Sequence, residues 1–546
     1  MSESEKFAKT VSTGKTVRRL IFVVLIVVCL GVFVGPIARM AWGAGTGSME
    51  EKEAVWRAYW IIAVFGGLLP FIPLFWKVKK AKSWLSARPL FANIVVIGAG
   101  LIAATHAGMV AAVLEAGVGY GWTMHSESGS LTTAAKALVA FDLYLLWCIT
   151  VQQLGALFVG LKSPIYLWVV SYPATLGYST ALFGCMPLAI VHAVASGPEP
   201  AAVVAVAAFG LAAFGLAQSL LDSPWEEVTV TVESPAGFDA DAGGSREPRD
   251  GVYAARGRHS GKTRLGPLEL SRGRGGDEPG RPLRIVQITD PHIGPFISIR
   301  RMNAFCEQTV ALDPDLVLMT GDYCTTEAHL TPGCLAAAFA PLAALKGRVY
   351  ATLGNHDHEV LRFVKDELAA LGVILIVDAE ALVETQAGLV QLVGVDFFFH
   401  DKPRLYSKVI RRFPPNARAA YRILLIHDPG AFRYVPADDH ALVLSGHTHG
   451  GQIGLVSCGL EKCTAVSVGS IGRIPDHGVW QLGTNRLYVN RGQGTRFMGG
   501  NFLVRFGVPA EASVLVVTTD STGVDAPEVS DSVFTRHERE EGMVGQ

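Results

Sequence analysis

Five short groups of residues in the second half of the chain carry side chains that can bind metal ions. Each group directly follows an apolar run with the length of a buried strand, and helical patterns at residues 300–312 and 359–371 separate some of these runs. The seven candidate metal ligands are Asp290, His292, Asp322, Asn355, His427, His447 and His449. Apolar strands that alternate with helices predict a sheet covered on both faces, and such folds bind ligands at the carboxyl ends of their strands. We therefore expect the five groups to converge at one edge.

The types of these residues suit a pair of divalent cations. A carboxylate such as that of Asp322 has two oxygens and can bridge two ions, whereas Asn355 offers a neutral oxygen and the histidines offer ring nitrogens. Two cations, two aspartates and a hydroxide leave one positive charge, which would attract a phosphate. Ions about 3.5–4 Å apart would activate the hydroxide and stabilise an in-line transition state. A single group occurs often by chance, but five in order favour phosphoester hydrolysis.

These motifs closely resemble those of the calcineurin-like metallophosphoesterase superfamily. The family pattern is D-x-H, G-D, G-N-H-D/E, H and G-H-x-H, and the chain has D-P-H, G-D-Y, G-N-H-D, H-D and G-H-T-H in that order. The resemblance covers residues 283–517. The longer motif G-H-T-H-G-G-Q, at residues 446–452, resembles a bacterial branch of membrane-associated phosphodiesterases that includes a UDP-2,3-diacylglucosamine pyrophosphatase. Residues 489–495 resemble the closing segment of that branch.

The resemblance implies a role for each residue. One metal would be held by Asp290, His292 and His449, and the other by Asn355, His427 and His447, with Asp322 bridging both. The resemblance also implies that His356 protonates or stabilises the leaving oxygen, with Asp357 tuning it. Mixed nitrogen and oxygen ligands favour manganese, iron, zinc or cobalt over magnesium or calcium, and the resemblance points to manganese. Cys324 and the loop at 457–463 are less usual features that bear on substrate access.

The first 222 residues predict a multi-span α-helical membrane region. Half of the whole chain is hydrophobic and only 17% is charged, against about 25% in soluble proteins, and the apolar excess precedes Asp222. About six stretches have the length and composition of a membrane-spanning helix, namely residues 20–38, 55–76, 92–114, 137–161, 164–195 and 201–221. Four ionisable residues in or near them, His106, Glu115, Asp142 and His192, are expected to be solvated or to pack between helices.

The charges near the span ends predict the orientation. Lysines and arginines gather in the N-terminal segment and in the loop after the second span, so both are expected in the cytoplasm. Six spans then place the catalytic domain in the cytoplasm, whereas five place it on the far side, and the outcome depends on the kinked stretch at 164–195. A flexible linker is predicted at 223–282, a catalytic domain at 283–520 and a disordered tail at 521–546. For the catalytic domain, the resemblance implies an α/β fold, an αββα sandwich of two mixed sheets.

The sequence therefore predicts a membrane-anchored, dinuclear-metal enzyme that hydrolyses phosphodiester or pyrophosphate bonds. A lipid or lipid-linked substrate is preferred, and nucleotide phosphodiesters remain open. A tethered site sees lipid head groups at a high effective concentration. The alternatives are a membrane transporter or sensor with a regulatory metal-binding domain, and a metal-binding scaffold without turnover. The net charge of -1 gives no signal for nucleic acid. The eight cysteines are expected to be thiols, although Cys458 and Cys463 could pair or bind a metal.

Overall fold

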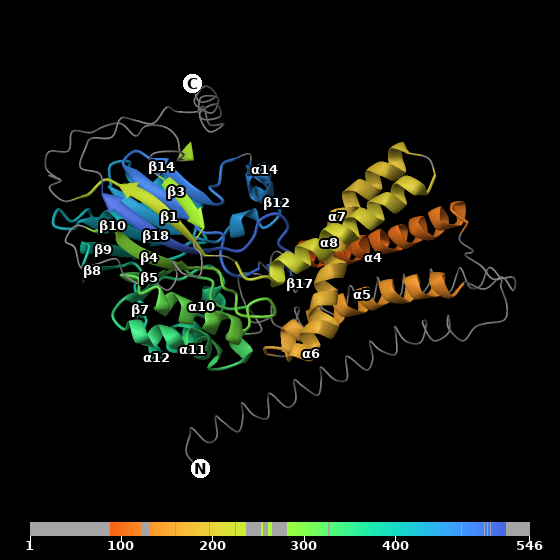
Figure 1. Cartoon of the computed structure of the whole chain (residues 1–546), viewed down its shortest axis with the longest axis horizontal. Coiled ribbons are helices and arrows are strands. Elements are labelled where there is room, and N and C mark those ends of the chain that lie inside the picture. The colour runs from red at the N-terminus through yellow and green to blue at the C-terminus, as the bar shows by residue number, and fades with distance from the viewer. Residues whose placement is uncertain are drawn as a thin grey trace, which may run out of the picture. The chain divides into compact units, whose positions relative to one another are not determined.

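The computed structural model of the chain divides into two compact units (Figure 1). Unit 1 comprises Met1–Gln218 and Phe497–Val504, and unit 2 comprises Ser219–Arg496 and Arg505–Gln546. The residues that the structure describes are 88–121, 132–158, 160–195, 197–223, 225–235, 253–254, 260–264, 281–325, 328–470, 472–495, 497–498, 501–502 and 504–519. The predicted spans at 20–38 and 55–76, the N-terminal charges and the tail at 521–546 lie outside these residues.

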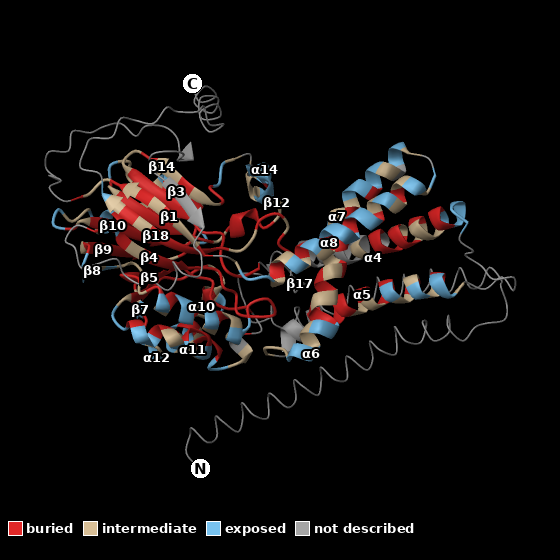
Figure 2. Cartoon of the chain, viewed as in Figure 1, coloured by how far each residue is buried: buried red, intermediate tan, exposed pale blue. Residues whose placement is uncertain are grey.

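Unit 1 consists mainly of long apolar helices. These helices are α4 (Arg88–Gly119), α5 (Thr133–Phe158), α6 (Pro164–Tyr166), α7 (Tyr172–Val194) and α8 (Glu199–Leu220), with a π-helical turn at Leu167–Ser171 between α6 and α7. Three described helical stretches are long and apolar enough to cross a membrane, at Thr133–Gln152, Pro164–Val191 and Glu199–Leu220. They fall on three of the predicted spans, and α4 covers a fourth. Many residues of α7 and α8 are exposed (Figure 2), which suits helices that face lipid.

One buried polar pair lies among these helices. His106 of α4 has its Nδ1 atom 2.6 Å from Asp142 Oδ1 of α5, and its Nε2 atom 3.0 Å from the carbonyl oxygen of Gly177 in α7. Because a buried polar group needs a partner, this arrangement ties three helices together. The pair therefore supports the predicted helix-packing role of the two residues.

Unit 2 is built on two mixed seven-stranded sheets. The first has the order β3 (Ser260–Arg264), β1 (Trp225–Val232), β18 (Ala512–Thr519), β4 (Leu283–Ile288), β5 (Leu316–Met319), β6 (Val349–Ala351) and β7 (Ile374–Leu375). The second has the order β2 (Tyr253–Ala254), β14 (Gly478–Leu482), β15 (Asn485–Val489), β11 (Ala441–Ser445), β10 (Tyr421–Ile426), β9 (Gly388–Val395) and β8 (Ala379–Thr385). Neighbours β4 to β7 are parallel, as are β9, β10, β11 and β15.

A continuous apolar core joins the two sheets. Side chains from the first sheet, such as Leu283 and Leu316, pack in one cluster with Leu392, Ile423 and Leu442 of the second. Figure 2 shows most of both sheets as buried. This burial on both faces explains why the strands read as continuous apolar runs rather than as alternating patterns.

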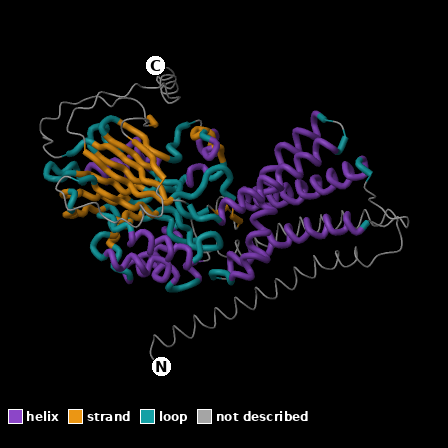
Figure 3. Tube along the Cα trace, viewed as in Figure 1, coloured by secondary structure: helices purple, strands orange, loops and turns teal. Residues whose placement is uncertain are grey.

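Helices cover the outer faces of the sandwich (Figure 3). Helix α13 (Lys402–Arg412) packs through Tyr406 and Ile410 on strands of the second sheet. Helices α10 (Ile299–Ala311), α11 (Cys334–Phe339) and α12 (Leu361–Ala370) accompany the first sheet, where Trp225 of β1 stacks on Phe305 of α10 at 4.9 Å between ring centroids. The predicted αββα architecture after a helical membrane region is confirmed.

The range predicted as a linker contains strands of both sheets. Strands β1 and β3 fall within 223–282 and pair with each other and with β18, and β2 pairs with β14. Strand β1 forms because Val228, Val230 and Val232 alternate with polar residues and bury one face. Its partner β18 follows some 280 residues later, and such a long-range pairing leaves no local mark on the sequence.

Candidate metal centre

All five predicted groups lie at the carboxyl ends of strands. Strands β4, β5 and β6 end just before Asp290, Asp322 and Asn355, and strands β10 and β11 end just before His427 and His447. The strands are parallel within each sheet, so each set of ends meets at one edge. The two edges lie next to each other. This is shown by the two clusters described next, each of which contains side chains from both sheets.

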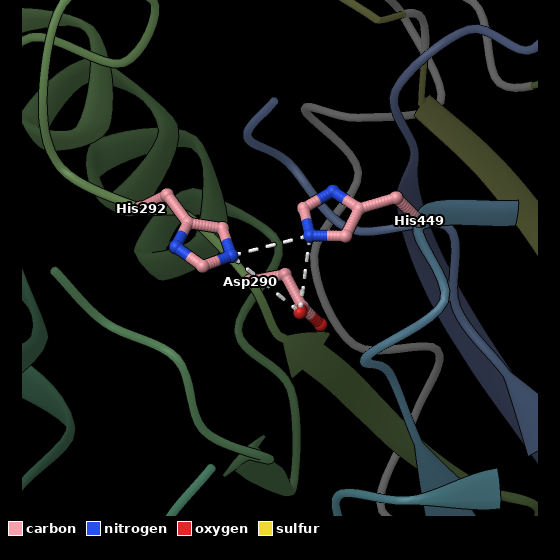
Figure 4. A group of neighbouring side chains, drawn as sticks. All are labelled: Asp290, His292 and His449. Carbon is pink, nitrogen blue, oxygen red and sulfur yellow. Dashed lines mark hydrogen bonds and ion pairs between the residues drawn. The ribbon is translucent and has the colours of Figure 1, made fainter. Parts of the chain in front are cut away.

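The first cluster consists of Asp290, His292 and His449, all of them buried (Figure 4). The Nε2 atoms of the two histidines face each other at 3.1 Å. Asp290 Oδ1 lies 3.4 Å from His449 Nε2 and 3.8 Å from His292 Nε2. Three donor atoms that converge at these separations could hold one ion between them.

The second cluster consists of Asp322, His427 and His447. His427 Nε2 lies 3.2 Å from Asp322 Oδ2 and 3.2 Å from His447 Nδ1. Asp322 Oδ2 is also 3.7 Å from His292 Nε2 of the first cluster. The carboxylate of Asp322 therefore lies between the two clusters, where a ligand that bridges two ions would be expected.

Each aspartate has one oxygen held by the protein and one oxygen turned to the cluster. Asp290 Oδ2 accepts hydrogen bonds from Thr289 Oγ1 at 2.7 Å and from the backbone nitrogen of His447 at 2.9 Å. Asp322 Oδ1 accepts one from the backbone nitrogen of His356 at 2.8 Å. The other oxygens, Asp290 Oδ1 and Asp322 Oδ2, face the histidines. Held this way, the carboxylates are oriented before any ligand arrives.

Two buried oxygens in the site have no hydrogen-bond partner among the described residues. They are Asp290 Oδ1 and the side-chain oxygen of Asn355. Leaving such atoms unsatisfied costs free energy of about 1–3 kcal/mol each, and more for a charged group. A divalent cation would satisfy both oxygens, so the residues present fit the metal pair that the sequence predicts.

The backbone at the site is strained. Five of the predicted ligands have φ angles in the left-handed region, namely Asp290 (51°), His292 (44°), Asp322 (57°), His447 (69°) and His449 (53°). Each such conformation costs on the order of 1–3 kcal/mol for a residue other than glycine, and such strain concentrates at functional sites. Glycines leave room for the carboxylates, because a Cβ atom at Gly354 or Gly446 would overlap the side chain of Asp322 or Asp290.

The electrostatics of the site also favour added positive charge. Burial lowers the pKa of His292 to about 3 and that of His447 to about 4, so both rings are neutral and able to bind a metal. His427 differs: burial lowers its pKa, but the charges of Asp322 and Asp290 outweigh this and raise it to about 10. Its Nδ1 atom donates to the carbonyl oxygen of Thr320 at 2.7 Å, which turns Nε2 to the cluster. The two carboxylates thus stabilise a proton on His427, and a metal cation would supply the same positive charge.

His356 lies at the edge of the centre and is part-exposed. Its ring centroid is 5.4 Å from that of His292, and its Nδ1 atom is 3.0 Å from Glu359 Oε1. Burial lowers the pKa of His356, but the hydrogen bond to Glu359 and the charges of Asp322 and Glu359 raise it overall. This shift favours the protonated ring, the form that can donate a proton to a leaving oxygen.

Asp357 has a different set of partners from those the sequence suggests. Its carboxylate is fully buried and accepts hydrogen bonds from the backbone nitrogens of Asp322 at 2.7 Å, Tyr323 at 2.9 Å and Gly354 at 2.8 Å. The ring of His356 pairs with Glu359 instead. Asp357 therefore fastens the loop after β5 to the loop after β6, and Glu359 is the carboxylate that acts on His356.

Sequence reasoning missed Arg505, which lies directly behind the first cluster. The side chain of Arg505 is buried, and its Nη2 atom is 3.3 Å from His449 Nδ1 while its Nη1 atom donates to the carbonyl oxygen of His449 at 3.2 Å. It also donates to the carbonyl oxygens of Arg491 and Gly494. Burial and the charge of Arg491 lower its pKa to about 9. Arg505 follows His449 by 56 residues, so no local pattern could have indicated it.

The rim of the second cluster carries an aromatic and a basic side chain. The ring of Phe397 lies 5.6 Å from the ring of His447, and the Nζ atom of Lys402 lies 5.0 Å above Phe397 and 2.6 Å from Asp428 Oδ2. Phe398 packs against the core, whereas Phe399 is exposed. Cys324 is buried and forms an isolated parallel β-bridge with Ile293.

Comparisons with known proteins agree with this geometry. Residues 283–451 match the family model described as calcineurin-like phosphoesterase. The chain is 23% identical to phosphodiesterase YaeI of Escherichia coli over 222 residues, which is 40% of this chain and 77% of that protein. It is 26% identical to the uncharacterized metallophosphoesterase YkuE of Bacillus subtilis over 249 residues, 44% of this chain and 79% of the relative.

A third relative is named as a transmembrane protein. The chain is 28% identical over 193 residues to a Bos taurus protein named transmembrane protein with metallophosphoesterase domain. The match covers 31% of this chain and 41% of the bovine protein, so it spans less than half of that relative. The family implies two divalent metal ions, and the two clusters supply candidate ligands for them. Residues 283–451 of this chain are therefore a calcineurin-like phosphoesterase domain, in a protein whose apolar helices suggest membrane association.

Proposed function

We propose that the protein is a membrane-anchored, dinuclear-metal hydrolase of phosphodiester or pyrophosphate bonds. The observation that supports this most is the position of Asp322, whose Oδ2 atom is 3.2 Å from His427 Nε2 of one cluster and 3.7 Å from His292 Nε2 of the other. A site for a single ion would not need a carboxylate between two sets of ligands. When bound, two ions would activate water and balance the charge of the phosphoryl group.

We assign the two sets of ligands as the family resemblance implies. Asp290, His292 and His449 would hold one ion, Asn355, His427 and His447 the other, and Asp322 both. The oxygen of Asn355 supports its place, because it is buried and unpaired. The mixed donor set fits manganese, iron, zinc or cobalt, and we propose manganese.

The remaining residues act on the substrate or on the ligands. His356 would donate a proton to the leaving oxygen, while Glu359 orients its ring and keeps it protonated. Asp357 would fix the positions of Asp322 and Gly354 through its backbone hydrogen bonds. Burial of the cluster excludes water, which strengthens the interaction of the site with an anionic phosphate.

We further propose that the substrate is a lipid or lipid-linked phosphoester and that the catalytic domain is cytoplasmic. The three described membrane-length helices support a lipid substrate, because a tethered site meets head groups at a high effective concentration. The positive charges near the first two predicted spans support the cytoplasmic side. A protease-protection assay on sealed cells tests the orientation, and cleavage of unit 2 without lysis would overturn it.

The reaction class is tested by hydrolysis of bis-p-nitrophenyl phosphate with added Mn²⁺. We expect Asp322→Asn to abolish both turnover and binding of the second metal ion, and His356→Asn to lower kcat by about 10²–10⁴-fold with metal retained. The matched controls are Asp366→Asn and His400→Asn, which change the same residue types at exposed positions. Equal rates for the wild type and Asp322→Asn would refute the assignment of this site as a metal-dependent phosphoesterase centre. Metal-independent solute flux in liposomes would favour the transporter alternative.

A further inference from the structure

An apolar segment of unit 2 projects beside the metal centre. It comprises β12 (Gly454–Leu455), a short 3-10 turn at Val456–Cys458, β13 (Leu460–Thr464), α14 (Ala465–Gly469) and the residues up to Ile474, and we name residues 454–474 the apron. Among the described residues of the apron, four large apolar side chains are exposed to solvent, namely Leu455, Leu460, Val468 (68% exposed) and Ile474. In Figure 1, β12 and α14 lie at the opposite end of unit 2 from β8 and β9.

The base of the apron is joined to the end of a candidate membrane span. The backbone nitrogens of Gly454 and Ser457 donate to the carbonyl oxygens of Phe506 and Gly507, at 2.8 Å and 2.9 Å. The preceding residue, Arg505, donates its backbone nitrogen to Ser219 Oγ at 2.7 Å. Ser219 lies in the last turn of α8, which is long and apolar enough to cross a membrane. Three consecutive residues reach at most about 10 Å, so the base of the apron is close to the end of this helix.

The residues at the start of unit 2, which include the last two of α8, make further contacts within that unit. The guanidinium of Arg301 donates to the carbonyl oxygens of Ser219 (3.3 Å) and Leu221, and its Nε atom donates to Asp222 Oδ1 at 2.6 Å. These contacts fix the positions of Ser219, Leu221 and Asp222 within unit 2. The end of a spanning helix lies at the lipid–water interface on whichever side it emerges. If α8 spans the membrane, the base of the apron, which is close to Ser219 in unit 2, would therefore lie near that interface.

The other side of the apron is tied to the loop that carries the metal ligands. Thr448, between His447 and His449, donates its hydroxyl to the carbonyl oxygen of Asp476 at 2.6 Å. The carboxylate of Asp476 accepts hydrogen bonds from the hydroxyls of Thr464 and Ser467 within the apron. The apron and the ligand loop are therefore one connected structure, and a surface that holds the apron also sets the depth of the metal centre.

We infer that the apron inserts its apolar side chains into the head-group layer of the bilayer, and that it presents the metal centre to phosphoesters at the membrane surface. Apolar side chains next to polar ones are stabilised at this interface, and the exposed Arg473 suits anionic head groups. The nature of the substrate rests on the proposed function, whereas the contact of the apron with the membrane does not. A lipid with a phosphodiester or pyrophosphate head group could then react while its acyl chains stay in the membrane.

Lipid quenching of a fluorophore tests the contact in the full chain. Cys458 and Cys463 are exposed thiols of the apron. In a variant with Cys29→Ser, Cys185→Ser and Cys463→Ser, Cys458 is labelled with bimane, and the protein is reconstituted in phosphatidylcholine–phosphatidylglycerol vesicles with or without a doxyl-labelled lipid. A matched protein carries Cys458→Ser and Leu382→Cys, which moves the label to the exposed position on β8.

We expect doxyl lipid to quench the label at Cys458 at least about twofold more than the label at position 382. Leu460→Glu combined with Val468→Glu should remove this difference, since charged side chains disfavour insertion. Turnover of bis-p-nitrophenyl phosphate by this variant should stay within about twofold of wild type. Equal quenching at both positions overturns the inference. The inference is also overturned if the doxyl lipid does not quench the label at Cys458 but the emission of the label changes with the protein-to-lipid ratio. That result would indicate contact with a second copy of the chain. Quenching without any turnover would refute the proposed function alone.

Discussion

Replacing Gly446 with alanine should disable the metal centre with little change to the rest of the fold. Gly446 does not have a positive φ angle, so an alanine can adopt its backbone conformation without strain. However, a Cβ atom there would lie well within 3.0 Å of both Asp290 Oδ2 and Thr289 Oγ1, closer than real Cβ atoms approach other atoms. One methyl group therefore acts directly on the carboxylate of a proposed ligand.

The size of the effect follows from the displacement. To reach contact distance, the carboxylate of Asp290 must move by about 1 Å, and a misplacement of this size at a catalytic site costs about 10²-fold in rate. The same movement weakens the hydrogen bonds that Asp290 Oδ2 accepts from Thr289 and His447. Overpacking costs about 1–3 kcal/mol of stability, so the domain should still fold.

The assay is kcat/KM for bis-p-nitrophenyl phosphate together with the bound metal measured on the same sample. We expect Gly446→Ala to lower kcat/KM by at least about 10²-fold and to lose part of the metal. Gly469→Ala is the matched control, because a Cβ atom at that position meets nothing within 4 Å. Wild-type activity and metal content in Gly446→Ala would refute the position assigned to Asp290.

Three further predictions concern stability. Asp439→Asn should lower the free energy of unfolding, measured in urea, by about 3–5 kcal/mol. The reason is that the buried guanidinium of Arg422, 2.9 Å from Asp439, loses its counter-charge. Asp438→Asn, at an exposed position, is the control. The hydrogen bond to Asp396 raises the pKa of His358, so His358 stabilises the fold below its unfolded pKa and loses this contribution as the pH rises through the folded value. The stability difference between wild type and His358→Gln should therefore be larger at about pH 5.5 than at about pH 8.5. Mn²⁺ at about 100 times its Kd should stabilise metal-free protein by about 2.7 kcal/mol, seen as a raised Tm, and an unchanged Tm would contradict a metal site.

The parts of the site that sequence could predict are local. A strand followed directly by a metal-binding side chain is visible in any short window, and parallel strands bring their ends together without further information. This explains why six of the seven predicted ligands fall in the two clusters, while the oxygen of the seventh, Asn355, is buried without a partner. The apolar spans were visible for the same reason, since composition over about 20 residues suffices.

The parts that sequence could not predict depend on long-range pairing. Arg505 contacts His449 across 56 residues, and β1 enters the first sheet only because β18 lies beside it. The role of Asp357 was out of reach for a different reason. A carboxylate beside a histidine suggests an interaction between the two, but the backbone turns Asp357 inward to three N–H groups and leaves His356 to Glu359.

The strain in the ligand loops gives a physical reason for coupling metal binding to folding. Left-handed backbone at residues such as Asp290 and His449 and the unpaired oxygen of Asn355 both cost free energy in the absence of cations. The two sheets and the hydrogen bonds of Asp357 and Arg505 hold these groups in place against that cost. A cation pair bound there would satisfy the unpaired oxygens of Asp290 and Asn355. The site is therefore preorganised, and its affinity for metal should exceed that of any variant in which the ligand loops are allowed to relax.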